Sequence, residues 1–126
     1  MTDPITIGSA GVKFIFSSDT EGLSFSEVYK NAGTSTVYTV PAAHVFWILH
    51  NSIAISGTYP HISASILANG NKILSVTASD GETNANSIVM DTMLKITAGQ
   101  TVQFLRDGVS SNGWCGMAVA GIETSA

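Results

Sequence analysis

From residue 34 onward, hydrophobic and polar residues alternate in short runs that turn-forming residues separate. The runs cover residues 36–40, 44–55, 62–76, 88–96, 101–105 and 114–122, and they are rich in β-branched and aromatic residues. Evenly spaced runs of this kind are typical of an all-β sandwich or barrel. No helical period follows Gly33, so the pattern predicts an antiparallel, all-β sandwich over residues 34–126.

Two turn signals set the register of this sandwich. Asn69-Gly70 divides the run 62–76 into two strands, and a two-residue Asn-Gly loop favours a type I′ hairpin because both residues must adopt a positive φ. Ala98-Gly99 separates the runs 88–96 and 101–105 in a similar way. We therefore expect a tight turn at each of these two positions.

The segment 45–49 is apolar at every position. Val45, Trp47 and Leu49 alternate with Phe46 and Ile48, so both faces of this strand are apolar. A strand of this kind is expected to be covered on both sides, once by the facing sheet and once by another partner. In a chain of 126 residues we expect that partner to be a second copy, which makes all five residues candidate subunit-interface residues.

Residues 1–33 differ from the rest of the chain. Residues 12–16 alternate weakly between apolar and polar, and glycines interrupt the segment repeatedly. We interpret it as an extended N-terminal arm with one or two short strands, which ends at a turn at Gly33. A short helical turn that contains Leu23 and Phe25 is the alternative.

The amino-acid composition reduces the number of function classes that fit this chain. Charged residues make up 11% of the chain, against about 25% in ordinary domains, while 44% are hydrophobic. A chain with so few charged residues is expected to have a charge-poor surface, which suits permanent contacts with other proteins. The net charge of −4 with five scattered Lys and Arg disfavours nucleic acid, and no apolar run reaches the roughly 18 residues of a membrane span. The N-terminus has no signal-peptide pattern, which predicts synthesis in a cytoplasm, and the single Cys115 excludes an internal disulfide.

Metal sites have weak candidates. His44 and His50 share a strand face but would lie about 20 Å apart, beyond the reach of one metal even with His61. Residues 80–91 place oxygen ligands as a calcium loop does, but the sixth position is Ala85 instead of Gly and the twelfth is Asp91 instead of Glu. A polar surface loop explains this segment better, and we expect no metal and no cofactor.

The sequence contains no recognisable catalytic motif. Cys115 has no Lys, Arg or His beside it, no Gly-x-Ser-x-Gly elbow is present, and Asp19 with Glu21 is explained by a solvated turn. We therefore expect a protein that is not an enzyme. Tyr59 and Trp114 are the aromatic residues that could stack on a sugar, which leaves a glycan-binding module as the alternative function.

Three motifs resemble those of small jelly-roll proteins from tailed-bacteriophage virions, which are similar to domains of the C1q and tumour-necrosis-factor type. They are the segment 37–45 (Val-Tyr-Thr-Val-Pro-Ala-Ala-His-Val), the segment 66–70 that ends in Asn-Gly, and the segment 94–102 that contains Ala-Gly-Gln-Thr-Val. The phage pattern has Gly where this chain has Ala43. The resemblance spans residues 34–124 and implies a two-sheet jelly roll that is often trimeric.

The resemblance also implies a role in the virion. We expect a homotrimeric decoration, or cement, protein that binds the major capsid protein or another virion component on the outer capsid and stabilises it, because the chain has the length of a whole small gene product. A tail-fibre or head-fibre tip that binds a receptor or glycan is the alternative. The arm would supply the capsid contacts through its apolar side chains: Val12, Phe14, Phe16, Leu23 and Phe25.

Overall fold

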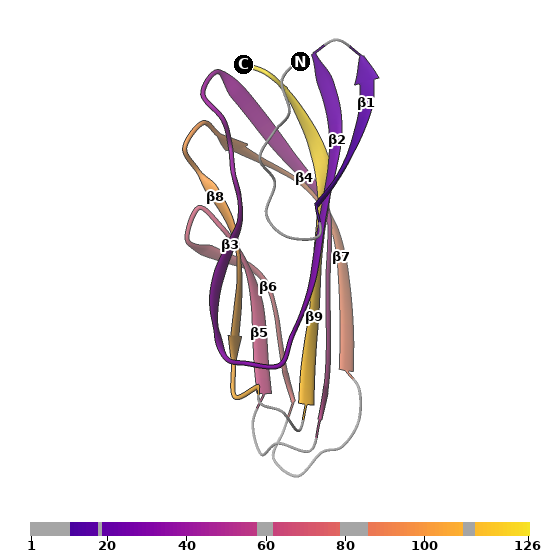
Figure 1. The fold of residues 1–126 in the computed structure, drawn as a ribbon, viewed down its shortest axis with the longest axis vertical. Helices are drawn as coiled ribbons and strands as arrows, with labels where there is room; N and C mark the ends of the chain where they lie inside the picture. Colours follow the sequence, from indigo (N-terminus) through magenta and orange to yellow (C-terminus); the bar gives the residue numbers. More distant parts are fainter. Residues whose placement is uncertain (1–10, 18, 58–61, 79–85, 110–112) are drawn as a thin grey trace.

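The computed structural model describes residues 11–17, 19–57, 62–78, 86–109 and 113–126, which contain strands and no helix. The strands, drawn in Figure 1, are β1 (Gly11–Ser17), β2 (Thr20–Tyr29), β3 (Gly33–Thr39), β4 (His44–Gly57), β5 (Ile62–Ala68), β6 (Asn71–Ala78), β7 (Asn86–Thr97), β8 (Thr101–Asp107) and β9 (Gly113–Ser125).

The strands form two antiparallel sheets that pack face to face, as the edge-on view in Figure 1 shows. Sheet A has the strand order β1-β2-β9-β4-β7, and sheet B has the order β3-β8-β5-β6. Apart from the pairs β1–β2 and β5–β6, neighbouring strands within each sheet come from distant parts of the sequence, and the chain crosses between the sheets several times. The predicted jelly-roll sandwich is therefore confirmed.

The core lies between the two sheets. Alternate residues of each strand point inward, and aromatic rings join the two layers: the ring centroids of Phe25 and Tyr38 are 4.9 Å apart, and those of Tyr38 and Phe46 are 5.5 Å apart. Phe104 is also fully buried. These contacts tie β2 and β4 of sheet A to β3 of sheet B.

Both predicted turns are confirmed. Asn69 and Gly70 have φ angles of 50° and 80°, as a type I′ hairpin requires, and they connect β5 to β6. Gly99 has φ of 82° in the turn between β7 and β8. Ala43 also adopts a positive φ of 64°, in the turn between β3 and β4.

Residues 11–29, expected to belong to an extended arm with one or two short strands, do form two strands, but these are part of sheet A and not of a separate arm. β2 pairs with β9 from Thr20 to Tyr29, so strand pairing crosses the predicted domain boundary at residue 33. Leu23 and Phe25 are 1% and 0% exposed because they alternate with serines and point into the core. That alternation is visible in the sequence and was the missed signal. Residues 1–10 lie outside the described residues.

The apolar segment of β4 divides between two faces. Phe46 and Ile48 are both 0% exposed and belong to the core, so they are not available as subunit-interface residues. Val45 and Trp47 lie on the opposite face, across from Thr124 and Ile122 of β9. The register shifts between Ile48 and His50, where Leu49 forms an irregularity in the strand.

Candidate functional site

The outer face of sheet A, which points away from sheet B, is hollowed along its centre. In the middle of the sheet the outward positions of β9 are glycine and alanine, and those of β2 and β4 beside them are serine and alanine. These small side chains leave an open groove of about 500 Å³ that crosses β2, β9, β4 and β7. Its outward-facing lining includes Ser26, Val28, Ser52, Ala54, Val89, Gly116 and Ala118.

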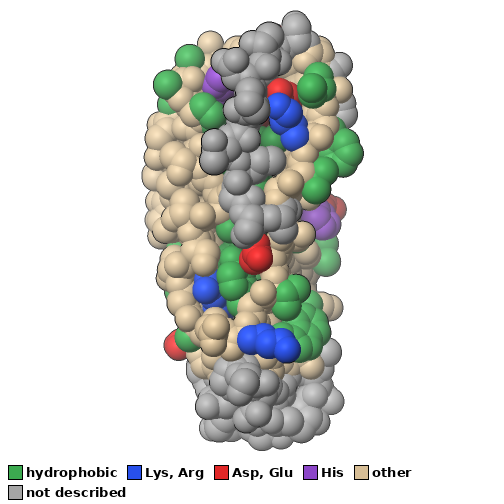
Figure 2. Space-filling view, in the orientation of Figure 1, with side chains coloured by type: hydrophobic (Ala, Val, Ile, Leu, Met, Phe, Trp, Pro, Cys, Tyr) green, Lys and Arg blue, Asp and Glu red, His purple; other side chains and the backbone are tan. Residues whose placement is uncertain are grey.

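Large hydrophobic side chains are exposed around this groove. Every exposed large hydrophobic residue in the described ranges belongs to a strand of sheet A, and none belongs to sheet B. In the face drawn in Figure 2, most of the hydrophobic side chains gather along the right-hand side of the molecule, where sheet A lies in Figure 1, and a smaller number lie at the upper left. The exposed large hydrophobic residues form one group on β1 and β2 (Val12, Phe14, Ile15 and Val28), one on β7 (Ile88, Val89 and Met93), and Trp114 at the start of β9.

Trp114 and Val28 form one end of the groove. A Cβ atom placed on Gly116 would lie 3.4 Å from Cζ3 of Trp114 and 3.9 Å from Cγ2 of Val28. The indole ring therefore lies beside Gly116, where a bulkier residue would meet it. Trp114 is 38% exposed, so part of this residue remains accessible to solvent.

Polar and charged side chains border the groove toward β7. Nδ1 of His50 lies 2.7 Å from Oδ1 of Asp91, and both side chains are exposed. Nζ of Lys95 lies 5.8 Å from the ring centroid of Trp47, within the range of a cation–π contact. Both pairs are cross-strand neighbours of β4 and β7, so this side of sheet A carries charged pairs as well as the exposed hydrophobic residues of β7.

The structure separates the residues that the sequence proposed as contacts. Val12 and Phe14 are 49% and 56% exposed, and they lie opposite Ser24 and Gly22 on the outer face of sheet A. Leu23 and Phe25 are buried and cannot contact a capsid, as noted above. The side chain of Phe16 and the whole of Tyr59 lie outside the described residues.

The candidate metal ligands do not come together in the described part of the chain. His44 lies 3.0 Å from the carbonyl oxygen of Ala42, and His50 pairs with Asp91. Asp91 is a residue of β7 and not of a loop, while residues 80–85 and His61 lie outside the described residues. The described residues contain no group of three or more His, Cys, Asp or Glu that could hold a metal ion.

Cys115 points into the core as expected, and burial raises the pKa of its thiol to about 11. Asn51 is an unexpected buried residue of β4. Its amide side chain is 0% exposed and finds no hydrogen-bond partner among the described residues. Its cross-strand neighbours are the apolar Met90 and Val119.

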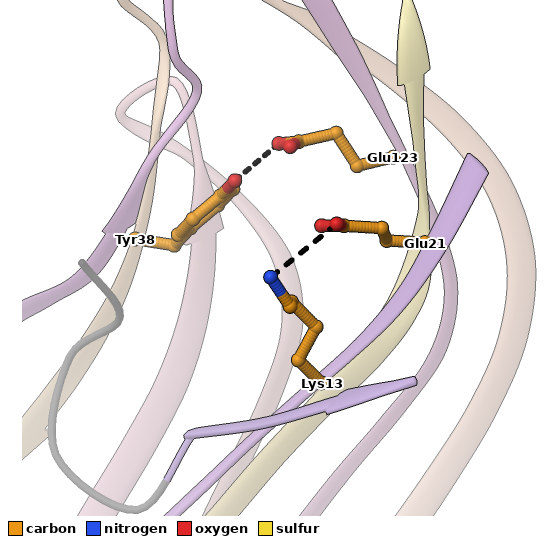
Figure 3. Close-up of polar contacts among 4 residues, drawn as sticks. All are labelled: Lys13, Glu21, Tyr38 and Glu123. Carbon is orange, nitrogen blue, oxygen red and sulfur yellow. Dashed lines mark hydrogen bonds and ion pairs between the residues drawn. The ribbon is translucent and has the colours of Figure 1, made fainter. Parts of the chain in front are cut away.

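Two buried acids were also missed by the sequence interpretation. Glu21 and Glu123 are both 0% exposed and lie opposite each other in β2 and β9 (Figure 3). Tyr38 of sheet B donates a hydrogen bond to Oε1 of Glu123, and Nζ of Lys13 lies 3.3 Å from Oε1 of Glu21. Glu21 is therefore not part of a solvated turn with Asp19. Glu21 lies two positions before Leu23 and four before Phe25, so the alternation along this strand could have placed Glu21 on the same inward face.

Comparisons with known proteins support the fold. A chain in the acid-stable capsid structure of Helicobacter pylori bacteriophage KHP30 aligns with 92% of this chain and 98% of its own length, at 13% identity and a TM-score of 0.57. Dimeric latent PorU from Porphyromonas gingivalis aligns with 94% of this chain at 11% identity and a TM-score of 0.55, but over only 14% of its own length. At these identities the likeness shows a shared fold alone.

No protein-family model matches the sequence, and no curated protein matches it. The structure also has no helix, within the ranges described, that is long and apolar enough to cross a membrane.

Proposed function

We propose that this chain is a structural protein of a tailed-phage virion that assembles as a homotrimer, decorates the outer capsid surface and has no catalytic activity. The observation that carries the proposal is the distribution of the exposed large hydrophobic residues, which within the described ranges all belong to strands of sheet A, most of them on its outer face. A face of this kind is typical of a protein interface. The low charge of the whole chain agrees with a surface used for contacts.

The distribution of the exposed residues suits a closed ring of copies. One hydrophobic group lies on β1 and β2, and the other lies on β7 at the opposite edge of sheet A. A two-fold dimer needs one self-complementary patch, whereas a closed ring pairs two different patches of neighbouring copies. Three copies are the smallest ring, so the edge of β7 in one copy would meet β1 and β2 of the next, and the grooves would line the ring axis.

The virion assignment is supported by the sequence motifs and the fold. The segments 37–45, 66–70 and 94–102 resemble those of small phage jelly-roll proteins, and the turns that they predict are present. The whole chain also shares its fold with a component of a phage capsid structure over nearly the full length of both. A decoration protein needs a contact surface and a stable fold, and it requires no catalytic group.

Light scattering on the purified protein tests the homotrimer. We expect a single species with three times the 13.1 kDa mass of one chain. A monomer at micromolar concentration would contradict the oligomer.

A capsid-binding assay tests the decoration role separately. Purified protein added to phage heads that lack it should co-sediment at a fixed copy number and should raise the temperature at which the heads release their DNA, because a ligand that binds only the intact shell stabilises it. Co-sedimentation at background level with a confirmed trimer would remove the decoration role while leaving the oligomer in place.

A receptor- or glycan-binding tip is the second candidate, and the exposure of Trp114 favours it. An aromatic ring that is 38% exposed beside an open groove could stack on the apolar face of a sugar. Titration with cell-surface saccharides, followed by Trp fluorescence, tests this function. It predicts saturable quenching that Trp114→Ala removes, and the absence of quenching in the parent protein counts against it.

A further inference from the structure

The interior of the sandwich holds a pair of acids at the end where β2 and β9 lie beside β1. Glu21 and Glu123 are paired residues of neighbouring strands, so their side chains leave the sheet on the same face about 5 Å apart at Cβ. Figure 3 shows their carboxyl groups side by side, with Tyr38 reaching across from sheet B and Lys13 approaching from β1. Both acids are fully buried.

The charges around this acid pair do not balance if both acids are ionised. Among the described residues, Lys13 is the one cation in direct contact, through Oε1 of Glu21 at 3.3 Å. Tyr38 contributes a neutral phenol, because burial raises its pKa above its ordinary value of 10.0 and the Glu123 carboxylate raises it further. His44 of β4 acts on Glu123 through its charge without contacting it. Two ionised carboxylates would therefore leave one buried negative charge without a counter-ion.

The hydrogen bonds of the acid pair also indicate that one of the two acids is protonated. Within the described residues, three carboxyl oxygens of the acid pair have no hydrogen-bond partner: both oxygens of Glu21 and Oε2 of Glu123. A buried carboxylate without donors is strongly disfavoured. One proton on Oε2 of Glu123 removes the uncompensated charge and supplies a donor to Oε2 of Glu21, the oxygen outside the ion pair with Lys13.

We propose that the acid pair takes up one proton on folding, held on Glu123 and donated to Glu21, so that the fold is stabilised by mild acid. The ammonium of Lys13 lies 3.3 Å from Oε1 of Glu21, which gives Glu21 and not Glu123 the neighbouring cation. Glu123 already accepts the Tyr38 hydrogen bond through Oε1, which leaves Oε2 for the proton. The device lies inside one subunit and does not depend on the assembly proposed above.

The expected pH dependence has a definite sign. Burial raises the pKa of Glu123 above its usual value of 4.5 and the charge of Glu21 adds to this, while Tyr38, His44 and Lys13 oppose it. An acid whose folded pKa is raised contributes stability that is complete below the unfolded value and is lost as the pH rises through the folded value. Stability should therefore fall as the pH rises above 4.5.

Urea unfolding of the full chain between about pH 4.5 and 8 at constant ionic strength measures this dependence. For one proton, the folding equilibrium constant of the parent protein should fall by up to about tenfold per pH unit until the folded pKa is passed. The Glu123→Gln variant should show a flatter profile, since the amide is always neutral and can still donate to Glu21. Asp107→Asn, which alters an exposed acid of β8, is the matched control and should keep the parent slope.

Infrared spectroscopy of the parent protein provides a readout that needs no variant to fold. A protonated carboxyl band should be present at about pH 6, where an ordinary glutamate is ionised. Absence of this band, or a Glu123→Gln profile with the slope of the parent, would overturn the proposal.

Discussion

The outer face of sheet B is covered with polar side chains that bond to one another, whereas the outer face of sheet A carries a groove and exposed hydrophobic residues. On sheet B the hydroxyl oxygens of Ser65 and Ser75 are 2.7 Å apart, and Gln103 donates to Thr36 at 3.1 Å. Sheet B thus satisfies its outward polar groups and offers no described hydrophobic patch. The contrast agrees with the proposal that sheet A, and not sheet B, is the face that contacts a protein partner.

The largest effect is expected from a charge placed on the outer face of sheet A. Val89 is 60% exposed on β7, so Val89→Lys should leave the monomer folded but convert the assembly to monomers, because each contact would bury an unpaired ammonium. Val28→Lys at the opposite edge should act in the same way. Light scattering gives the mass and circular dichroism checks the fold.

Thr77→Lys is the matched control on sheet B, where Thr77 is exposed on β6. It should keep the parent mass. The comparison between the sheets fails if Thr77→Lys dissociates the assembly or if Val89→Lys leaves it intact.

The two faces of β9 allow a second test within one strand. A Cβ on Gly121 would overlap the carbonyl oxygen of Trp47 and lie 2.8 Å from Cζ of Phe46, whereas a Cβ on Gly116 meets nothing closer than 3.4 Å. Gly121→Ala should therefore lower the free energy of unfolding by about 3 kcal/mol, and Gly116→Ala should change it little. Urea unfolding measures both variants, and equal losses would show that the inner face is not packed as described.

The fold was largely predictable from the sequence, because its signals are local. Asn69-Gly70 and Gly99 set turns through backbone conformations that few residues adopt, and period-two alternation marked most of the strands. β2 was missed because the many glycines and serines of the N-terminal region were interpreted as an arm. Its place beside β9, more than 80 residues away, is a long-range pairing that no local pattern contains.

The candidate site was less predictable than the fold. The segment 45–49 correctly indicated an apolar strand, but its pattern could not distinguish the core face of Phe46 and Ile48 from the outer face of Trp47. The groove arises where small residues of four strands meet, and those strands are adjacent only after folding. The acid pair is similar, since Glu21 and Glu123 are 102 positions apart in the sequence and become neighbours through strand pairing.

A smaller effect is expected from the hydrogen bonds on the outer face of sheet B. Ser65 is 5% exposed and shares a hydrogen bond with Ser75. Ser75→Ala should lower the free energy of unfolding by about 1 kcal/mol, because it leaves the Ser65 hydroxyl unpaired and shielded from water. The double variant with Ser65→Ala should recover most of this loss. If the two substitutions are simply additive in urea unfolding, the hydroxyls are not acting as a pair.

The smallest effect concerns the turn that carries the chain from sheet B into sheet A. Ala43 has φ of 64°, in the left-handed region, and the amide of His44 donates to the carbonyl oxygen of Pro41 across this turn. Glycine adopts that conformation without the steric penalty of a Cβ, although it also makes the unfolded chain more flexible. We expect Ala43→Gly to raise the free energy of unfolding by about 0.5 kcal/mol, the relief of strain exceeding the entropic cost. Ala42→Gly, at an exposed position next to it without a positive φ, should instead be neutral or destabilising. A loss of stability in both variants would mean that the Ala43 conformation carries no strain, and the glycine of the phage pattern would then serve another purpose at this turn.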